Sequence, residues 1–167
     1  VNRMETDDAL GIIQTRSKDT CIVTIDKDLD TIYGPHYNFG KQLYYEVSPE
    51  EADYFFWTQV MTGDSSDNIR GIPKVGPKTA QKMLQPHYGS WVDLHNRVKQ
   101  EYNNRGIANE FHETATLLWI QREAWVNFDG SNLREHDRLT RNNFESSTVN
   151  ESTEEDSGVR QEASWSA

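Results

Sequence analysis

The alternation of apolar and polar positions predicts a small α/β arrangement in the first part of the chain. Residues 6–18 are predicted to form a helix, since spaced apolar residues follow a Thr-Asp-Asp opening of good capping types. The β-branched run CIVTI, residues 21–25, is typical of a buried parallel strand, so we expect Cys21 to be a buried core thiol. A Gly-Pro pair at residues 34–35 is typical of a turn, and residues 42–47 predict a second strand.

Helices dominate the pattern from residue 48 onward. The sequence Ser-Pro-Glu-Glu at residues 48–51 is a strong helix start, because proline favours the first helical position and acids favour the first turn. That helix is predicted to end near Met61. A segment rich in Gly, Pro, Ser and Asp follows, and three further helices are predicted over residues 77–84, 91–102 and 108–123.

The aromatic and apolar groups within these helices are expected to form a core. Phe55, Phe56 and Trp57 stand in the first of the four helices, and a second group is Leu117, Leu118 and Trp119. We favour core packing over a surface that stacks on bases for both groups.

These elements divide the chain into three predicted parts. Residues 1–60 form a partial α/β unit with too few strands for a whole sheet, residues 61–126 form a helical unit, and residues 127–167 form an acidic tail. Residues 145–167 are rich in Ser, Thr and Glu and are expected to be disordered. Because the chain opens on Val1 rather than Met, we expect sequence to precede it, or a separate chain to supply the missing part.

The net charge of −10 is unevenly distributed. Residues 69–105 carry seven Lys and Arg against two acids, whereas residues 127–167 carry nine acids against four Arg. An approaching duplex responds to local charge, so the basic segment is compatible with binding of phosphates. No apolar run reaches the length of a membrane helix, and a single cysteine fits a reducing compartment.

Three groups of acids are the candidate chemistry. Each group lies at the start or the end of a predicted helix or strand. The group of Asp26 and Asp28 follows the predicted strand at its carboxyl end, which is where α/β sheets bind ligands. Carboxylates gathered in one place repel each other unless a cation lies between them, and oxygen ligands favour Mg²⁺ over zinc. Each group alone could instead cap a helix or form a turn. The members are Glu5, Asp7 and Asp8; Asp26 and Asp28; and Asp64 and Asp67.

The segment GIPKVGPKTA, residues 71–80, predicts a hairpin that leads into a short basic helix. Glycines allow close approach, and the amides at a helix N-terminus can bind a phosphate. Lys74, Lys78 and Lys82 add positive charge without reading base sequence. The alternative is a surface turn followed by a solvated basic helix.

These motifs together resemble the 5′–3′ exonuclease and flap endonuclease superfamily, with a leaning toward phage and bacterial members. ETDDALG (residues 5–11), TIDKDLD (24–30) and TGDSSDNIRGIPKVGPKTAQKML (62–84) are similar to three motifs of that family, in order and spacing. The resemblance covers about residues 4–125. It implies the C-terminal part of a PIN-like α/β nuclease domain, followed by a helix-three-turn-helix subdomain.

The resemblance also implies roles for residues. The seven acids would hold two Mg²⁺ or Mn²⁺ ions for hydrolysis of DNA phosphodiesters near 5′ ends, in replication or repair. Carbonyl groups of Ile72 and Val75 would contribute to a K⁺ site. The DNA-backbone clamp would comprise Arg70, Gly71, Lys74, Val75, Gly76, Lys78, Thr79 and Lys82.

The sequence departs from the family pattern before its first residue. Family members carry an earlier metal-binding Asp and a cationic arch, and neither precedes Val1. A second hypothesis is therefore a DNA-binding module that does not cut. The expected partners are duplex DNA with a 5′ end or flap, and RNA primers, in the cytoplasm of a bacterium or a phage-infected cell.

Overall fold

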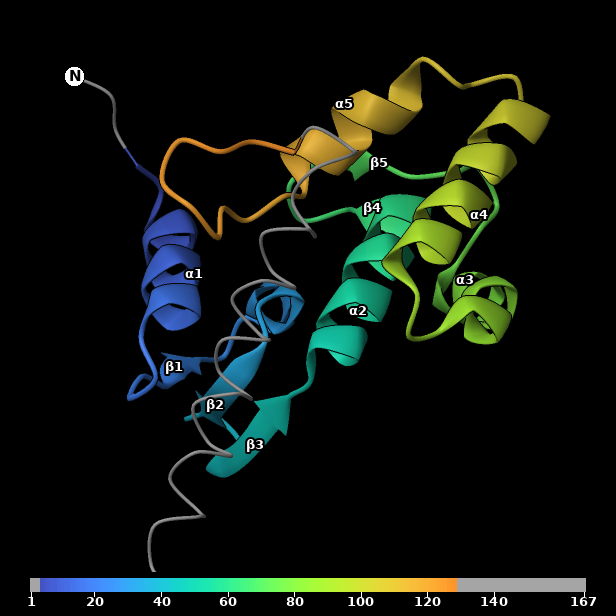
Figure 1. Cartoon of the computed structure of the whole chain (residues 1–167). Coiled ribbons are helices and arrows are strands. Elements are labelled where there is room, and N and C mark those ends of the chain that lie inside the picture. Colours follow the sequence, from blue (N-terminus) through green and yellow to red (C-terminus); the bar gives the residue numbers. More distant parts are fainter. Residues whose placement is uncertain (1–3, 129–167) are drawn as a thin grey trace, which may run out of the picture. The chain divides into compact units, whose positions relative to one another are not determined.

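The computed structural model describes residues 4–128, which belong to one compact unit. Strands and helices alternate in its first half, and the second half is mainly helical (Figure 1). The acidic tail and its predicted disorder lie outside the described residues. Within residues 4–128, the helices are too short or too polar to span a bilayer.

The first half contains a mixed three-stranded sheet. Strand β1 (Ile22–Thr24) pairs in parallel with β2 (Gly34–Asn38), which pairs antiparallel with β3 (Leu43–Val47). Strand β3 confirms the strand predicted over residues 42–47. The turn predicted at residues 34–35 is wrong: these residues begin β2, and Gly34 supplies a φ of 114° at its start.

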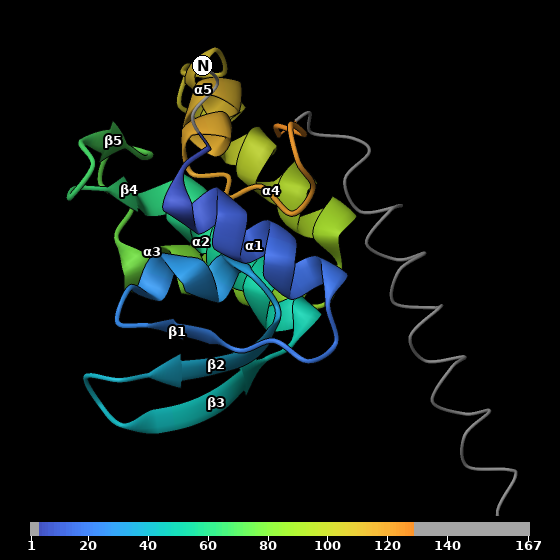
Figure 2. The ribbon, with the colours of Figure 1, turned by 90° about the vertical axis from the view of Figure 1, so that its left-hand side faces the viewer.

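Strand β1 is buried on one face only. Ile22 is 2% exposed and packs with Leu29 and Ile32, whereas Val23 is 56% exposed. Figures 1 and 2 show helices α1 (Thr6–Arg16) and α2 (Pro49–Thr62) on the same side of these strands. Side chains alternate between faces of a strand, so the uncovered face exposes every second residue. The prediction of a fully buried strand is therefore wrong, and so is the buried thiol, since Cys21 is exposed.

Helix α2 is the centre of the packing. It begins with a capping box, in which the Ser48 side chain accepts from the Glu51 amide and the Glu51 side chain accepts from the Ser48 amide. Phe56 and Trp57 are almost fully buried and contact the rings of several later aromatic residues. The core prediction is confirmed for both, while Phe55 is half-buried.

The second half wraps around α2. Short strands β4 (Gly63–Asp64) and β5 (Ile69–Arg70) form an antiparallel pair, followed by α3 (Pro77–Leu84), the 3-10 helix η2 (Gln85–His87), α4 (Trp91–Asn104) and α5 (Glu110–Leu117). The helix predicted over residues 77–84 coincides with α3. Helix α4 extends two residues beyond the predicted end.

Helix α5 is shorter than predicted because the chain after it is held by the first half. The Gln121 amide donates to Asp8 Oδ1 over 2.8 Å, and Arg122 Nη2 donates to the Thr31 carbonyl over 2.7 Å. Leu118 and Trp119 lie in the core as predicted, but Leu117 is 60% exposed, so its core assignment is wrong.

Candidate metal centre and nucleic-acid interface

Three carboxylates from separate elements converge at one point. Asp28 lies on the 3-10 helix η1 (Lys27–Thr31), Asp64 ends β4, and Asp67 lies in the turn before β5. One oxygen from each lies within 4.8 Å of the others. Among residues 4–128 this is the set of acids close enough to share one metal ion, and hard oxygen donors at this spacing fit a divalent cation.

Asp64 is the fixed member of the cluster. It is 7% exposed, and its Oδ1 accepts from the Ser66 amide over 2.7 Å. This backbone hydrogen bond is the main reason why the pKa of Asp64 lies below its usual value. Asp64 is therefore an ionised carboxylate with a defined orientation. The alternative that Asp64 and Asp67 cap a helix near Ile69 is wrong, because Ile69 begins a strand.

Asp28 has the opposite electrostatic character. Burial, then a hydrogen bond to the Asp64 carboxylate and the negative charge of Asp26 raise the pKa of Asp28 to about 6. Gln59 Nε2 on α2 donates to Asp28 Oδ1 over 2.6 Å, while Lys27 partly offsets the negative charge. Carboxylates that the fold brings this close repel each other, and a cation bound between them would stabilise their ionised forms.

The remaining predicted metal ligands differ in their surroundings. Burial, followed by the charges of Asp26, Asp8 and Asp67, raises the pKa of Asp7, so this carboxylate shares the negative field of the cluster. Glu5 is the exposed N-cap residue of α1 and makes no side-chain capping bond.

Asp8 and Asp26 also bind backbone amides. The Asp8 carboxylate accepts from the Gln121 amide, and Asp26 Oδ1 accepts from the Asp28 amide over 2.9 Å. Asp26 is thereby the N-cap residue of η1. Sequence reasoning missed Gln59, whose position on α2 gives no local signal for contact with Asp28 31 residues earlier.

The hairpin at residues 71–76 is built on close backbone contact. A Cβ added to Gly71 would lie 2.2 Å from the Thr62 carbonyl carbon, so only glycine fits there. The Ile72 amide donates to the Met61 carbonyl over 2.8 Å, and the Ile72 and Val75 side chains are buried. These two residues can therefore meet a ligand only through their backbone.

The N-terminus of α3 faces solvent. Its N-cap Gly76 offers no side-chain cap, and a Cβ added there would meet nothing within 4 Å. The Lys74, Lys78 and Thr79 side chains next to this end are exposed, as are Arg70 on β5 and Lys82 in the last turn of α3. Backbone amides and nearby cations are what a phosphate group requires.

A groove of about 400 Å³ runs from Asp64 to α3. Asp64 and Lys27 line one part of it, Tyr54 and Phe55 of α2 line its wall, and Pro77 at the start of α3 lines another part. The Tyr54 hydroxyl donates to the Gln81 carbonyl over 2.9 Å and so joins α2 to α3 beside the groove. Asp64 of the candidate metal centre and two residues of α3, Pro77 and Gln81, therefore line the same groove.

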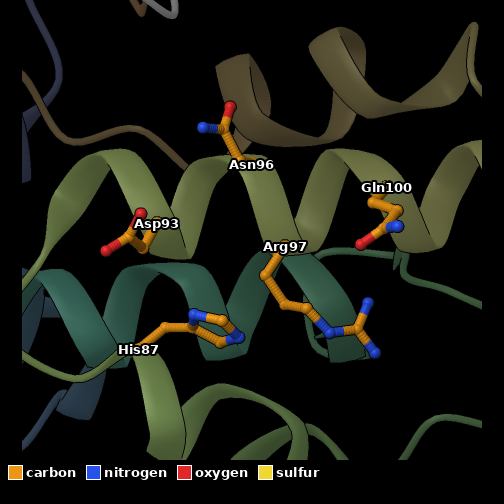
Figure 3. Close-up of a pocket in the computed structure, with 5 residues that line it drawn as sticks. All are labelled: His87, Asp93, Asn96, Arg97 and Gln100. Carbon is orange, nitrogen blue, oxygen red and sulfur yellow. The ribbon is translucent and has the colours of Figure 1, made fainter.

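A second hollow lies away from this surface, between η2 and α4. It measures about 280 Å³, and the His87 and Arg97 side chains lie on the same side of α4 within it (Figure 3). None of the acids of the cluster or the hairpin residues lines it. We therefore locate the candidate chemistry in the groove beside Asp64.

Comparison with known sequences identifies relatives of this region. A sequence model of the 5′–3′ exonuclease family, C-terminal SAM fold, matches residues 51–129. A flap endonuclease Xni of Aeromonas salmonicida is 36% identical over 100 residues, covering 58% of this chain and 36% of the relative. A 5′–3′ exonuclease of Halalkalibacterium halodurans is 32% identical over 107 residues, covering 59% of this chain and 32% of the relative.

A DNA polymerase I of Rhizobium leguminosarum is 36% identical over 94 residues, which are 49% of this chain and 9% of the polymerase. The chain therefore spans about a third or less of the length of these relatives. The crystal structure of the T5 D15 protein co-crystallised with metal ions shares the fold, with a TM-score of 0.56 and 17% identity over 84% of this chain and 59% of that one. By sequence, residues 51–129 of the chain belong to the C-terminal domain of the 5′–3′ exonuclease family.

Proposed function

We propose that the chain is the metal-binding and duplex-binding part of a 5′–3′ exonuclease or flap endonuclease that hydrolyses DNA near 5′ ends. The convergence of Asp28, Asp64 and Asp67 within 4.8 Å carries this proposal. The proposal is supported by relatives named flap endonuclease and 5′–3′ exonuclease, and by the metal ions in the T5 D15 crystals. Relatives named DNA polymerase I support a role in DNA replication or repair.

We assign two divalent ions, Mg²⁺ or Mn²⁺, to the acids. Asp28, Asp64 and Asp67 would hold one ion, and Asp7 with its neighbours on α1 would contribute to the other. When bound, such ions supply Lewis acidity and an activated water for attack on phosphorus. Glu5, Asp8 and Asp26 complete the proposed set at its edge.

The protein's own groups orient this centre. The Ser66 amide fixes Asp64 in its ionised form, and Gln59 fixes the direction of Asp28. Protonation of Asp28 opposes metal binding, so the centre would load better as pH rises through about 6. Lys27, at the rim of the groove, is suited to a phosphate of the bound strand.

The hairpin and α3 are the proposed backbone clamp. Amides at Gly76 and Lys78 and the ammonium groups of Lys74 and Lys82 would bind phosphates without reading bases, and the strand would reach the acids along the groove. The carbonyls of Ile72 and Val75 would hold a K⁺ ion, which would add positive charge to the clamp.

The second candidate is a module that binds duplex DNA and does not cut. The observation favouring it is the chain's coverage of only 36% and 32% of two nuclease relatives. Under this alternative, the hairpin and α3 bind duplex DNA, and the acids beside them do not catalyse hydrolysis.

Cleavage of a 5′-labelled flap and a blunt duplex separates the two candidates. The wild-type chain is assayed in Mn²⁺, Mg²⁺ and EDTA beside Asp64→Asn, with Asp93→Asn as a matched control from exposed α4 surface. Nuclease function predicts cutting that requires metal, is lost in Asp64→Asn and is kept in Asp93→Asn. No cutting, together with DNA binding that weakens as salt rises, would assign the chain to the module.

A further inference from the structure

A buried carboxylate on α4 binds two arginines. Glu101 is 6% exposed, and its two oxygens accept from Arg97 Nη1 over 3.1 Å and from Arg105 Nε over 3.0 Å. Arg97 stands four residues earlier on α4, and Arg105, four residues later, is the C-cap residue of this helix. A buried acid is tolerated only when its charge is compensated, so Glu101 and these arginines form one unit.

Arg105 extends this unit to the hairpin. Its Nη1 donates to the Pro73 carbonyl over 3.1 Å, a contact that joins residues 32 positions apart. Nε of the same guanidinium is bound to Glu101, so the plane of the group is held from both sides. The end of α4 is thereby tied to the segment that precedes α3.

The bonded carbonyl belongs to the peptide that enters Lys74, and Lys74 has a φ of 64°. A residue with a side chain seldom adopts this left-handed conformation unless its surroundings impose it. Here Ile72 and Val75 are anchored in the core on either side, and the Val75 amide donates to the Ile72 carbonyl over 3.1 Å. The Arg105 bond fixes the peptide between these anchors, and Lys74 is left exposed at the tip.

We propose that Glu101 and Arg105 are positioning residues that hold the hairpin in its DNA-binding conformation. This inference rests on the proposed function, because it takes residues 71–76 as part of the backbone clamp. Neither residue needs to touch DNA. Glu101 orients Arg105, and Arg105 orients the peptide that presents Lys74.

The Glu101→Gln variant distinguishes two explanations, because they predict opposite changes in the affinity for DNA. If only net charge mattered, removal of an acid would strengthen binding of DNA. If Glu101 positions the hairpin, the same change weakens binding. We expect Glu101→Gln and Arg105→Lys each to raise the Kd for a fluorescent duplex about fivefold to tenfold, the size of one ordering hydrogen bond.

The measurement is fluorescence anisotropy in EDTA at several salt concentrations, with Asp93→Asn as the control that removes an exposed acid from α4. Thermal unfolding identifies variants that fail to fold. If Glu101→Gln does not fold, the test uses Arg105→Lys, which keeps the charge. In a double-mutant cycle, Lys74→Met should cost less binding in the Arg105→Lys background than in the wild type.

The inference is overturned if Glu101→Gln binds DNA as tightly as Asp93→Asn, or if the Lys74 and Arg105 effects are additive. Failure of the proposed function looks different. In that case Lys74→Met combined with Lys78→Met leaves DNA binding unchanged, whatever the Glu101 variant does.

Discussion

Asp28 and Asp64 show how strongly surroundings determine the behaviour of one residue type. Their carboxylates lie in the same cluster, yet the pKa of Asp28 is raised to about 6 and that of Asp64 is lowered. Burial and nearby negative charge dominate at Asp28, whereas the Ser66 amide stabilises the ionised form of Asp64.

This difference predicts how stability depends on pH in the absence of metal. The pKa of Asp28 is higher in the folded chain, about 6, than its ordinary value of 3.8, so its contribution to stability is complete below 3.8 and is lost as pH rises through about 6. We expect the Tm in EDTA to fall over this window by more in the wild type than in Asp28→Asn. Circular dichroism melts at several pH values measure the Tm of both proteins. An identical dependence of Tm on pH in the two proteins would contradict the raised pKa of Asp28.

Two glycines of the hairpin predict opposite outcomes. Gly71→Ala forces a Cβ against the backbone of Thr62 and Gly63, so it should cost about 3 kcal/mol of unfolding free energy. Gly76→Ala has open space and should change stability by less than about 0.5 kcal/mol. If a DNA backbone approaches Gly76, the second variant nevertheless weakens DNA binding. Denaturant unfolding and anisotropy measure the two effects, and unchanged DNA affinity in Gly76→Ala would exclude Gly76 from the clamp.

At the scale of elements, the sequence predicts those whose boundaries have local causes. Ser48 and Glu51 form the capping box that starts α2, and Pro77 starts α3 at the predicted residue. Strand β2 escaped prediction because its Gly-Pro start has the composition of a turn. Helix α5 was predicted too long because Asp8 and Thr31, distant in sequence, bind the segment that follows it. Long-range hydrogen bonds leave no local pattern.

Helix α3 carries a prediction about salt. Lys78→Met removes one exposed cation at its N-terminus and should lower the slope of log Kd against log salt by about one. The fold should be unaffected, because the side chain is exposed. Lys41→Met, which removes an exposed cation beside β3, is the matched control. Equal salt slopes for the Lys78 and Lys41 variants would remove α3 from the DNA interface.

At the scale of the whole molecule, a chain of net charge −10 concentrates its positive charge in residues 69–105, which carry seven Lys and Arg and two acids. The motifs predicted the acids and the hairpin, since those residues are close in sequence to recognisable turns. They could not predict which acids converge. Asp28 reaches Asp64 because η1 packs against α2, where Gln59 donates to Asp28. The Glu101–Arg105–Pro73 connection was equally invisible, because it depends on α4 lying beside the hairpin.

Whether Asp28, Asp64 and Asp67 bind a divalent ion decides most directly between a metal centre and a cluster without one. Titration of Mn²⁺ into the chain by calorimetry at about pH 7.5, well above the pKa of Asp28, tests this point. We predict saturable binding in the wild type and in Asp93→Asn, and a loss of about tenfold or more in affinity in Asp64→Asn. Equal Mn²⁺ affinity in the wild type and the folded Asp64→Asn protein would contradict the metal centre.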